Sequence, residues 1–441
     1  MSSSYLSSNP YKGTRDFYPR DMVFRNWYFN KIRMFLNQRG YEEYQGPILE
    51  SFDIYAAKSG VELVNEQLYS FEDKSGRKLV IRPEMTPTVA RLVASRYEQL
   101  SFPLKWFSIA NFMRYENPQK GRLREHWQTN VDIFGVEGIQ AEFEIFSLII
   151  NIMKSFNADE NMFKIRISHR KLFNYLLENI LGVAPDSIKL ISKVIDKKSK
   201  ITEDQYRKWL EEIGLNSASI EALDKMFTFN LSNLGEYIKE ESECFNEIKA
   251  LFALLEKTGL DRFCEFDLTI VRGFDYYTGT VFEVYDNSME NRRSLFGGGR
   301  YANLVGMFKG VNVPGIGFGM GDVTFQNFLE IHNLIPQNIW NEFKVLIVTF
   351  EEVNYHEYYL ISRELTDNQI VNNIYLNTKD KIKKQFTFAD RMKYDLVIIM
   401  GPDELKENTL LIKNLVNKDQ TQIKNNELVS YIKNLKNIKN D

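Results

Sequence analysis

The segment RYENPQKGRLREHWQTNVD, residues 114–132, connects two stretches in which apolar and polar side chains alternate, as they do in strands. KWFSIANFM (105–113) comes before it, and VDIFGVEG (131–138) overlaps its end. A plain hairpin between two such strands needs only about two to five turn residues. This connection is longer and crowded with arginines and carboxylates. We therefore predict that it carries function as well as turning the chain.

The charges in this loop favour a bound polyphosphate. Arg114 stands at the end of the first predicted strand, and Arg122 and Arg124 lie in the loop that would pass over the sheet face. Guanidinium keeps its charge and donates paired hydrogen bonds to phosphate oxygens, which lysine cannot do. Considered by itself, however, the loop is equally compatible with an exposed hairpin whose charges are solvated.

Two polar residues follow the loop on backbone that we expect to be extended. Gln128 and Asp132 are four positions apart, so in a strand their side chains face the same side of the sheet. An amide and a carboxylate on one surface suit a small polar ligand that carries an amine.

A second polar stretch, VRGFDYYTGTVFE (271–283), also looks like a strand. In a regular strand Arg272 and Tyr276 share a face, and Tyr277 takes the other unless Gly273 introduces a bulge. These residues predict the floor of a polar pocket. The alternative is a half-buried strand with aromatic packing, which explains Arg272 poorly.

Composition places the chain among ordinary globular proteins. Its 441 residues predict two or three domains, and 44% hydrophobic with 26% charged residues is a typical balance. The formal net charge of −3 gives no overall attraction for nucleic acid. Any such partner must therefore be held by local patches.

Several classes of protein are disfavoured by what the chain contains. Cys244 and Cys264, the only cysteines, form no CxxC pair, which argues against a disulfide framework and a cysteine zinc site and suits a reducing compartment. The four histidines are scattered, so we expect no metal site. The N-terminus does not resemble a signal peptide, and no apolar run approaches the roughly 18 residues of a membrane span. We expect a cytoplasmic protein without a membrane partner.

Periodicity and turn signals give a coarse order of elements. In chain order we predict a helix at 20–39, a strand within 41–50, a strand at 78–82, a helix capped near Thr86, a helix at about 140–155, helices throughout 170–258, a strand at 266–286, a strand running into a helix at 314–331, and a linker at 331–342. From residue 343 onward strands and helices alternate, as in a small parallel or mixed α/β sheet.

Taken together, these segments resemble the histidine–tRNA ligases, a family of class II aminoacyl-tRNA synthetases. The resemblance extends over nearly the whole chain in the family's order. It rests on YKGTRDFYP (11–19), the helix and GPILE strand (motif 1), RPEMTP (82–87), the stretch 112–132 (motif 2), VRGFDYYTGTVFE, and GGGRY (297–301).

The resemblance implies an α+β fold. Residues 1–330 would form a class II catalytic domain on an antiparallel sheet, with 170–258 as a helical insertion. A linker at 331–342 would lead to an α/β anticodon-binding domain at 343–441. It also implies a homodimer formed through motif 1, with L-histidine, ATP with Mg²⁺, and tRNA(His) as ligands.

By the same resemblance, the chain would activate histidine as its adenylate and transfer it to tRNA. Arg272 and Arg114 are the implied catalytic residues, which stabilise the α-phosphate as the histidine carboxylate attacks. The implied histidine-binding residues are Glu84, Met85, Thr86, Arg114, Gln128, Asp132, Arg272, Tyr276, Tyr277 and Tyr301.

The remaining implied roles fall on the loop and the strand after it. Glu116 and His126 would lie at the adenine, and Arg122 would contact the γ-phosphate. Gln119 and Lys120 would meet the acceptor end of tRNA.

Two positions depart from the family pattern. The third class II motif usually ends in G-L-E-R, but here the run is GMGDVTF, which places Thr324 where the arginine is expected. His126, next to Trp127, occupies the position at which an aromatic ring commonly stacks on adenine. Both changes bear on ATP binding.

Two other interpretations share this fold. The first is a regulatory subunit of the ATP phosphoribosyltransferase that begins histidine synthesis, which the missing arginine favours slightly. The second is a non-catalytic tRNA-sensing module such as those of translation-control kinases, although no kinase segment is present.

Overall fold

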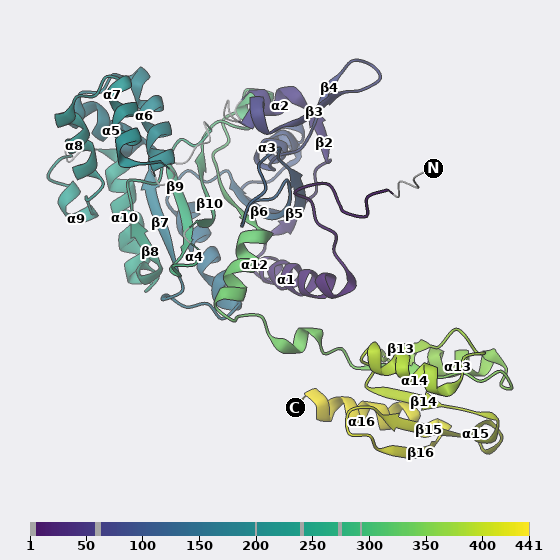
Figure 1. Cartoon of the computed structure of the whole chain (residues 1–441). Coiled ribbons are helices and arrows are strands. Elements are labelled where there is room, and N and C mark those ends of the chain that lie inside the picture. Colours follow the sequence, from purple (N-terminus) through teal and green to yellow (C-terminus); the bar gives the residue numbers. More distant parts are fainter. Residues whose placement is uncertain are drawn as a thin grey trace. The chain divides into compact units, whose positions relative to one another are not determined.

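The computed structural model describes residues 6–57, 63–198, 201–238, 242–271, 276–291 and 293–440. The chain divides into two compact units, Met1–Pro336 and Gln337–Asp441, and each is described by itself (Figure 1). No described helix combines the length and the apolar character needed to cross a bilayer.

An eight-stranded sheet organises the first unit. In spatial order its strands are β1 (Glu42–Glu43), β5 (Leu104–Met113), β6 (Glu125–Phe134), β11 (Gly315–Gly321), β10 (Ser294–Tyr301), β9 (Thr280–Asp286), β7 (Phe163–His169) and β8 (Cys264–Phe266). The strands from β5 to β7 pair antiparallel, and the two edge strands pair parallel to their neighbours.

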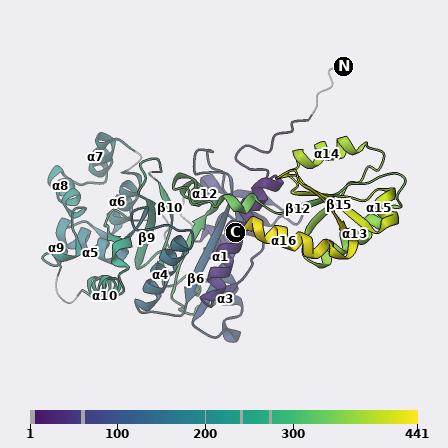
Figure 2. The same ribbon diagram turned by 90° about the horizontal axis from the view of Figure 1, so that it is seen from below.

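Alternation along β6 explains how this sheet separates its core from its site. Val131 and Ile133 join the main hydrophobic cluster, whereas the buried polar residues Asn130 and Asp132 take the opposite face. The apolar face is covered by α1 (Pro19–Gln38), α4 (Gln140–Ser155), α12 (Asp322–Ile331) and part of α10 (Glu243–Lys257), as Figures 1 and 2 show.

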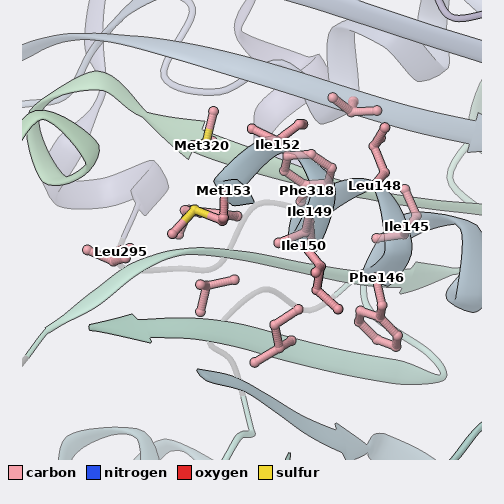
Figure 3. Close-up of a cluster of buried hydrophobic side chains, with 14 of the residues drawn as sticks. Ile145, Phe146, Leu148, Ile149, Ile150, Ile152, Met153, Leu295, Phe318 and Met320 are labelled. Carbon is pink, nitrogen blue, oxygen red and sulfur yellow. The ribbon is translucent and has the colours of Figure 1, made fainter. Parts of the chain in front are cut away.

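Helix α4 is the centre of this core because it is apolar on almost every side. Ile145, Phe146 and Ile149 are fully buried against strands β9, β10 and β11 (Figure 3). Each buried side chain of this size contributes roughly 1.5–3 kcal/mol. The sheet therefore has a rigid support beneath the face that carries the polar residues.

A smaller sheet and two helices lie near the polar face. The strands are β2 (Leu49–Ser51), β4 (Lys78–Ile81) and β3 (Tyr69–Glu72), and the helices are α2 (Phe52–Ala56) and α3 (Thr86–Ser95). Helix α3 packs with Phe134 and Tyr301 in one apolar cluster. Its first residues are thereby held beside the large sheet.

The segment between β7 and β8 is helical and has its own apolar core. It comprises α5 (Arg170–Leu181), α6 (Pro185–Lys197), α7 (Glu203–Glu212), α8 (Ser217–Met226), α9 (Leu231–Leu234) and α10. Thr202, Asn216 and Asn230 accept backbone hydrogen bonds at the starts of α7, α8 and α9, so local capping defines these boundaries.

The second unit is a mixed five-stranded sheet with helices on both faces. The sheet order is β13 (Val371–Ile374), β12 (Lys344–Ile347), β14 (Leu396–Ile399), β15 (Thr409–Asn414) and β16 (Gln420–Lys424), and the helices are α13 (Tyr355–Asp367), α14 (Ile382–Arg391), α15 (Pro402–Glu407) and α16 (Leu428–Asn440). The predicted alternation ends at β15, since β16 follows it directly and pairs with it as an antiparallel hairpin that the sequence pattern missed.

Three predicted elements differ in detail. The expected strand within 41–50 is reduced to β1 and the start of β2. Helix α3 begins at Thr86 without a side-chain cap, and its N-cap is Met85. The expected strand at 266–286 is interrupted because Asp267 accepts hydrogen bonds from the backbone and hydroxyl of Thr269, which turns the chain.

Candidate active site

The polar face of the large sheet holds a cavity of about 170 Å³. It is lined by Glu84, Thr86, Arg114, Gln128, Asn130, Asp132, Tyr276, Tyr277, Phe296, Gly297, Tyr301, Gly317, Phe318 and Gly319. Most of the predicted histidine-binding residues are therefore brought together, from segments far apart in the sequence. Asn130 was not predicted, although its position between Gln128 and Asp132 on one strand face could have revealed it.

Two carboxylates in this cavity are each bound by a tyrosine. The hydroxyl of Tyr276 donates to Oε2 of Glu84 at 2.9 Å, and that of Tyr301 donates to Oδ1 of Asp132 at 2.6 Å. All four residues are buried. These hydrogen bonds fix the carboxylates in place while leaving each with further lone pairs for a ligand.

Burial changes the charge that Asp132 carries. It raises the pKa of Asp132 to about 7, although the hydrogen bond from Tyr301 acts in the opposite direction. Burial together with Glu84 also raises the pKa of Tyr276 well above its ordinary value, so this tyrosine remains a neutral donor. The cavity thus contains a carboxyl group that titrates near neutrality and prefers a cationic partner.

Glycines form the floor of the cavity. A Cβ on Gly317 would lie 2.3 Å from Oδ1 of Asp132, and one on Gly319 would lie 2.2 Å from Nε2 of Gln128. The pattern GIGFGMG places glycine at every second position of β11, so one strand face carries no side chains. The spacing of two residues between glycines is the feature of the sequence from which this floor could have been predicted.

Arg114 enters the cavity from the end of β5. Its Nε donates to the carbonyl of Pro83 at 2.9 Å, which fixes the plane of the guanidinium group. No described residue accepts a hydrogen bond from its terminal nitrogens, which remain available to an anion. The site accordingly combines one oriented guanidinium with two held carboxylates.

The arginine loop, residues 115–124, closes on itself at its tip. Gln119 and Arg122 exchange two backbone hydrogen bonds around Gly121, whose φ of +81° suits glycine. Arg122 lies 3.5 Å from Oε2 of Glu116 and its side chain is half exposed. Gln119 and Lys120 are exposed at the tip.

Arg124 does not serve the site as we had expected. Its guanidinium donates to the hydroxyl of Tyr11 and the carbonyl of Glu116, and it is buried. The carbonyl of Gly13 accepts hydrogen bonds from the backbone of Arg124 and Glu125. This N-terminal strap, residues 11–15, therefore holds the start of β6, and the sequence pattern gave no sign of the strap.

His126 lies on the strand directly after the loop. Burial, and then the nearby cations Arg114 and Arg15, lower its pKa to about 3. The ring is therefore neutral at physiological pH. The ring of its neighbour Trp127 is covered by the guanidinium of Arg25, whose carbon lies 3.7 Å from the ring centroid. This face of the Trp127 ring is therefore occupied by a side chain of the protein.

Two predicted residues lie elsewhere or cannot be placed. Met85 is fully buried with Ala110 and Phe112 and does not line the cavity. Arg272 lies outside the described residues. Tyr277 shares the cavity with Tyr276, because both precede β9 in irregular backbone rather than alternating along a strand.

Comparisons with known proteins identify the family of the chain. A family model for histidyl-tRNA synthetase matches residues 13–322, and one for an anticodon binding domain matches residues 344–435. The histidine–tRNA ligase of Leptospira biflexa serovar Patoc is 43% identical over 434 residues, covering 98% of this chain and 99% of that protein. The chain belongs to the histidyl-tRNA synthetase family.

Members of this family attach histidine to tRNA with ATP as a substrate, and this chain is an aminoacyl-tRNA synthetase of that kind. The expected class II α+β fold, with a catalytic domain followed by an anticodon-binding domain, is confirmed. The relationship to full-length ligases favours this activity over the two non-catalytic interpretations.

Solved structures show the same fold. The histidyl-tRNA synthetase of Nostoc sp. PCC 7120 matches with a TM-score of 0.78 at 22% identity and covers 98% of this chain and all of that chain. A structure described as an ATP phosphoribosyltransferase regulatory subunit/histidyl-tRNA synthetase from Bacillus halodurans matches at 0.72 and 23% identity, covering 87% and 97%. At these identities the fold is shared, whatever the function.

A larger cavity, of about 430 Å³, lies in the second unit between α13 and α15. Glu357, Glu364, Asp367 and Glu404 are among its lining residues, with Arg363 beside them. The smaller cavity is the stronger candidate for the active site, because held carboxylates, an oriented guanidinium and a shifted pKa converge there.

The glycine floor can be tested by Gly317→Ala. The new Cβ would displace the carboxylate of Asp132 or the backbone of Val131, so we expect the KM for histidine to rise at least about tenfold. Steady-state kinetics of tRNA charging measures this. Gly321→Ala is the matched control on the same strand face, since its Cβ would meet Thr324 at an ordinary 3.6 Å. Equal effects of the two changes would contradict the assignment.

Proposed function

We propose that Arg114 and Arg272 stabilise the α-phosphate of ATP while the carboxylate of L-histidine attacks it in line. A bond forms between a carboxylate oxygen and the α-phosphorus, and the bond from that phosphorus to the bridging oxygen breaks, releasing pyrophosphate. The attacking group is already ionised at neutral pH, so the step needs no general base. The observation that carries this proposal is the convergence of Arg114 with two tyrosine-bound carboxylates in one cavity.

In this proposal the carboxylates bind the amine and the side chain of histidine. Glu84, Asp132 and Gln128 supply the polar contacts, while Tyr276 and Tyr301 hold the two carboxylates still. An amino acid without matching polar groups would leave these buried atoms unpaired. Such sites discriminate by about 10⁴–10⁵-fold, which makes a separate editing site unnecessary.

ATP would lie along the arginine loop. Arg122 would contact the γ-phosphate, Glu116 would approach the adenine, and the neutral ring of His126 would stack on the base. Mg²⁺ would arrive with the phosphates. No described group of three or more acidic, histidine or cysteine side chains could hold a metal ion, so ATP itself would supply most of its ligands.

The tRNA would contact both units. Gln119 and Lys120 are exposed at the tip of the arginine loop, where they can meet the acceptor end. Residues 343–441 would read the anticodon, with 331–342 as linker and 170–258 as an insertion in the catalytic domain 1–330. We further propose that the protein acts in the cytoplasm.

The exchange of pyrophosphate into ATP tests the activation step without tRNA. With histidine, ATP and Mg²⁺ the protein should catalyse exchange. Arg272→Ala and Arg114→Ala should each reduce it at least about 100-fold, because charge developing on the α-phosphate loses its partner. Histidine binding without any exchange in the unmodified protein would instead support a regulatory role.

Lys120→Ala provides the complementary variant for the same assay. It should slow transfer to tRNA more than it slows exchange, since the loop tip is proposed to meet only the acceptor end. Equal losses in both reactions would remove that role from Lys120.

The pKa of Asp132 predicts a pH dependence of histidine binding. Below about pH 7 its carboxyl group is mainly protonated and cannot balance the ammonium group of histidine. The KM for histidine in exchange should therefore fall as pH rises from 6 to 8. Asp132→Asn should have a higher KM for histidine. Its KM should also lose the part of the pH dependence that comes from ionisation of the Asp132 carboxyl group. Because the substrate titrates identically in both assays, parallel profiles would rule out the proposed contact.

We also propose a homodimer formed through the region of α1, β1 and the small sheet. Met34 is 63% exposed and Ile48, Leu49 and Phe71 are each more than 40% exposed, while β1 is a sheet edge. Sedimentation should return twice the chain mass of 51.8 kDa. Ile48→Asp should shift the protein towards the single chain, and a monomeric unmodified protein would refute the assembly.

A further inference from the structure

The start of α12 lacks a basic side chain at the position where the family pattern places one. Thr324 stands there, and its hydroxyl donates to the carbonyl of Leu295 at 2.6 Å. The tip of the arginine loop lies against the same residue, because a Cβ on Gly121 would be 3.7 Å from Cγ2 of Thr324. Thr324 therefore links α12 to the beginning of β10 by a hydrogen bond, and it lies beside the loop proposed to hold ATP.

The hydrogen bond from Thr324 fixes the chain segment that carries Arg293. Arg293 immediately precedes β10 and lies two residues from Leu295. Its Nη2 donates to Oε1 of Gln119 at 3.0 Å, so its guanidinium reaches the tip of the arginine loop from the strand side. A cation just before β10 thus reaches the same loop tip that lies beside Thr324.

Three other arginines near the loop, Arg15, Arg122 and Arg124, already have partners within the protein. Arg15 lies 2.6 Å from the carboxylate of Asp322, and Arg122 lies 3.5 Å from that of Glu116. Arg124 is buried beneath the N-terminal strap. By contrast, Arg293 is exposed, and within the described part of the chain it has no carboxylate within ion-pair distance. Its bond to the Gln119 amide leaves the positive charge unbalanced.

We propose that Arg293 binds the γ-phosphate of ATP, together with Arg122, and so replaces the arginine missing at position 324. A triphosphate is the ligand whose charge this unbalanced guanidinium would match, and a fork of N–H donors can exchange the single bond to Gln119 for two bonds to phosphate oxygens. The inference rests on the proposed course of ATP along the arginine loop.

Arg293→Ala should weaken ATP binding selectively. In pyrophosphate exchange without tRNA, we expect the KM for ATP to rise about 10- to 100-fold, the loss of one charge-assisted contact, and the KM for histidine to change less than twofold. A non-hydrolysable analogue of histidyl-adenylate lacks the β- and γ-phosphates. Its inhibition constant should stay unchanged, which also shows that the variant is folded. Arg293→Lys should recover part of the loss.

Two further variants separate phosphate binding from a structural role. Arg262→Ala removes an exposed arginine that is paired with Glu160, and as the matched control it should leave the KM for ATP unchanged. Adding Thr324→Arg to Arg293→Ala should restore ATP affinity by returning a cation to the same place.

An unchanged KM for ATP in Arg293→Ala would overturn the inference, as would an equal loss of analogue binding or an equal rise of the KM for ATP in Arg262→Ala. The proposed activation step would survive any of these results, because exchange by the unmodified protein and its loss in Arg114→Ala are measured separately.

Discussion

The site depends on the close approach of β6 side chains to the backbone of β11. Asp132 and Gln128 lie over glycines, at distances that no Cβ would tolerate. The antiparallel register pairs Asp132 with Gly317, over which its carboxylate lies, and pairs Gln128 with Gly321, from which its side chain extends over the next glycine, Gly319. A change on β11 would therefore act directly on the ligand-binding groups of β6.

The pairing of β6 with β11 places the carboxyl group of Asp132 in a buried position, and burial disfavours its negative charge. Asp132 is buried on a sheet whose other face is packed by α4, and the resulting desolvation favours its neutral form. Tyr301 supplies one hydrogen bond, which is too little to hold the carboxylate fully ionised at neutral pH. A cationic ligand can supply the rest, so binding energy is available for selecting an amine. The rigidity of the apolar core beneath prevents the carboxylate from escaping to solvent instead.

Local patterns predicted the strand–loop–strand unit and part of the cavity, whereas Glu84, Thr86 and Tyr301 came from the resemblance to the histidine–tRNA ligases. Alternation identified β5, and spacing placed Gln128 and Asp132 on one face. Long-range contacts could not be found this way. Arg124 is diverted by Tyr11 and Gly13, more than a hundred positions earlier, and no periodicity encodes that partnership. Tyr276 and Tyr277 meet in one cavity because a turn replaces the expected strand.

The difference between local patterns and long-range contacts also explains how a different segment of the chain can supply a phosphate-binding cation. What a triphosphate requires is a cation at a point in space, and several backbone segments can deliver a side chain to one point. Here α12 begins beside the start of β10, and the hydroxyl of Thr324 fixes that adjacency through Leu295. Thr324, which carries no charge, thus holds in place the start of β10, and Arg293 reaches the loop from just before that strand. Motif patterns record the sequence position of a charge, whereas the chemistry depends on its location in the fold.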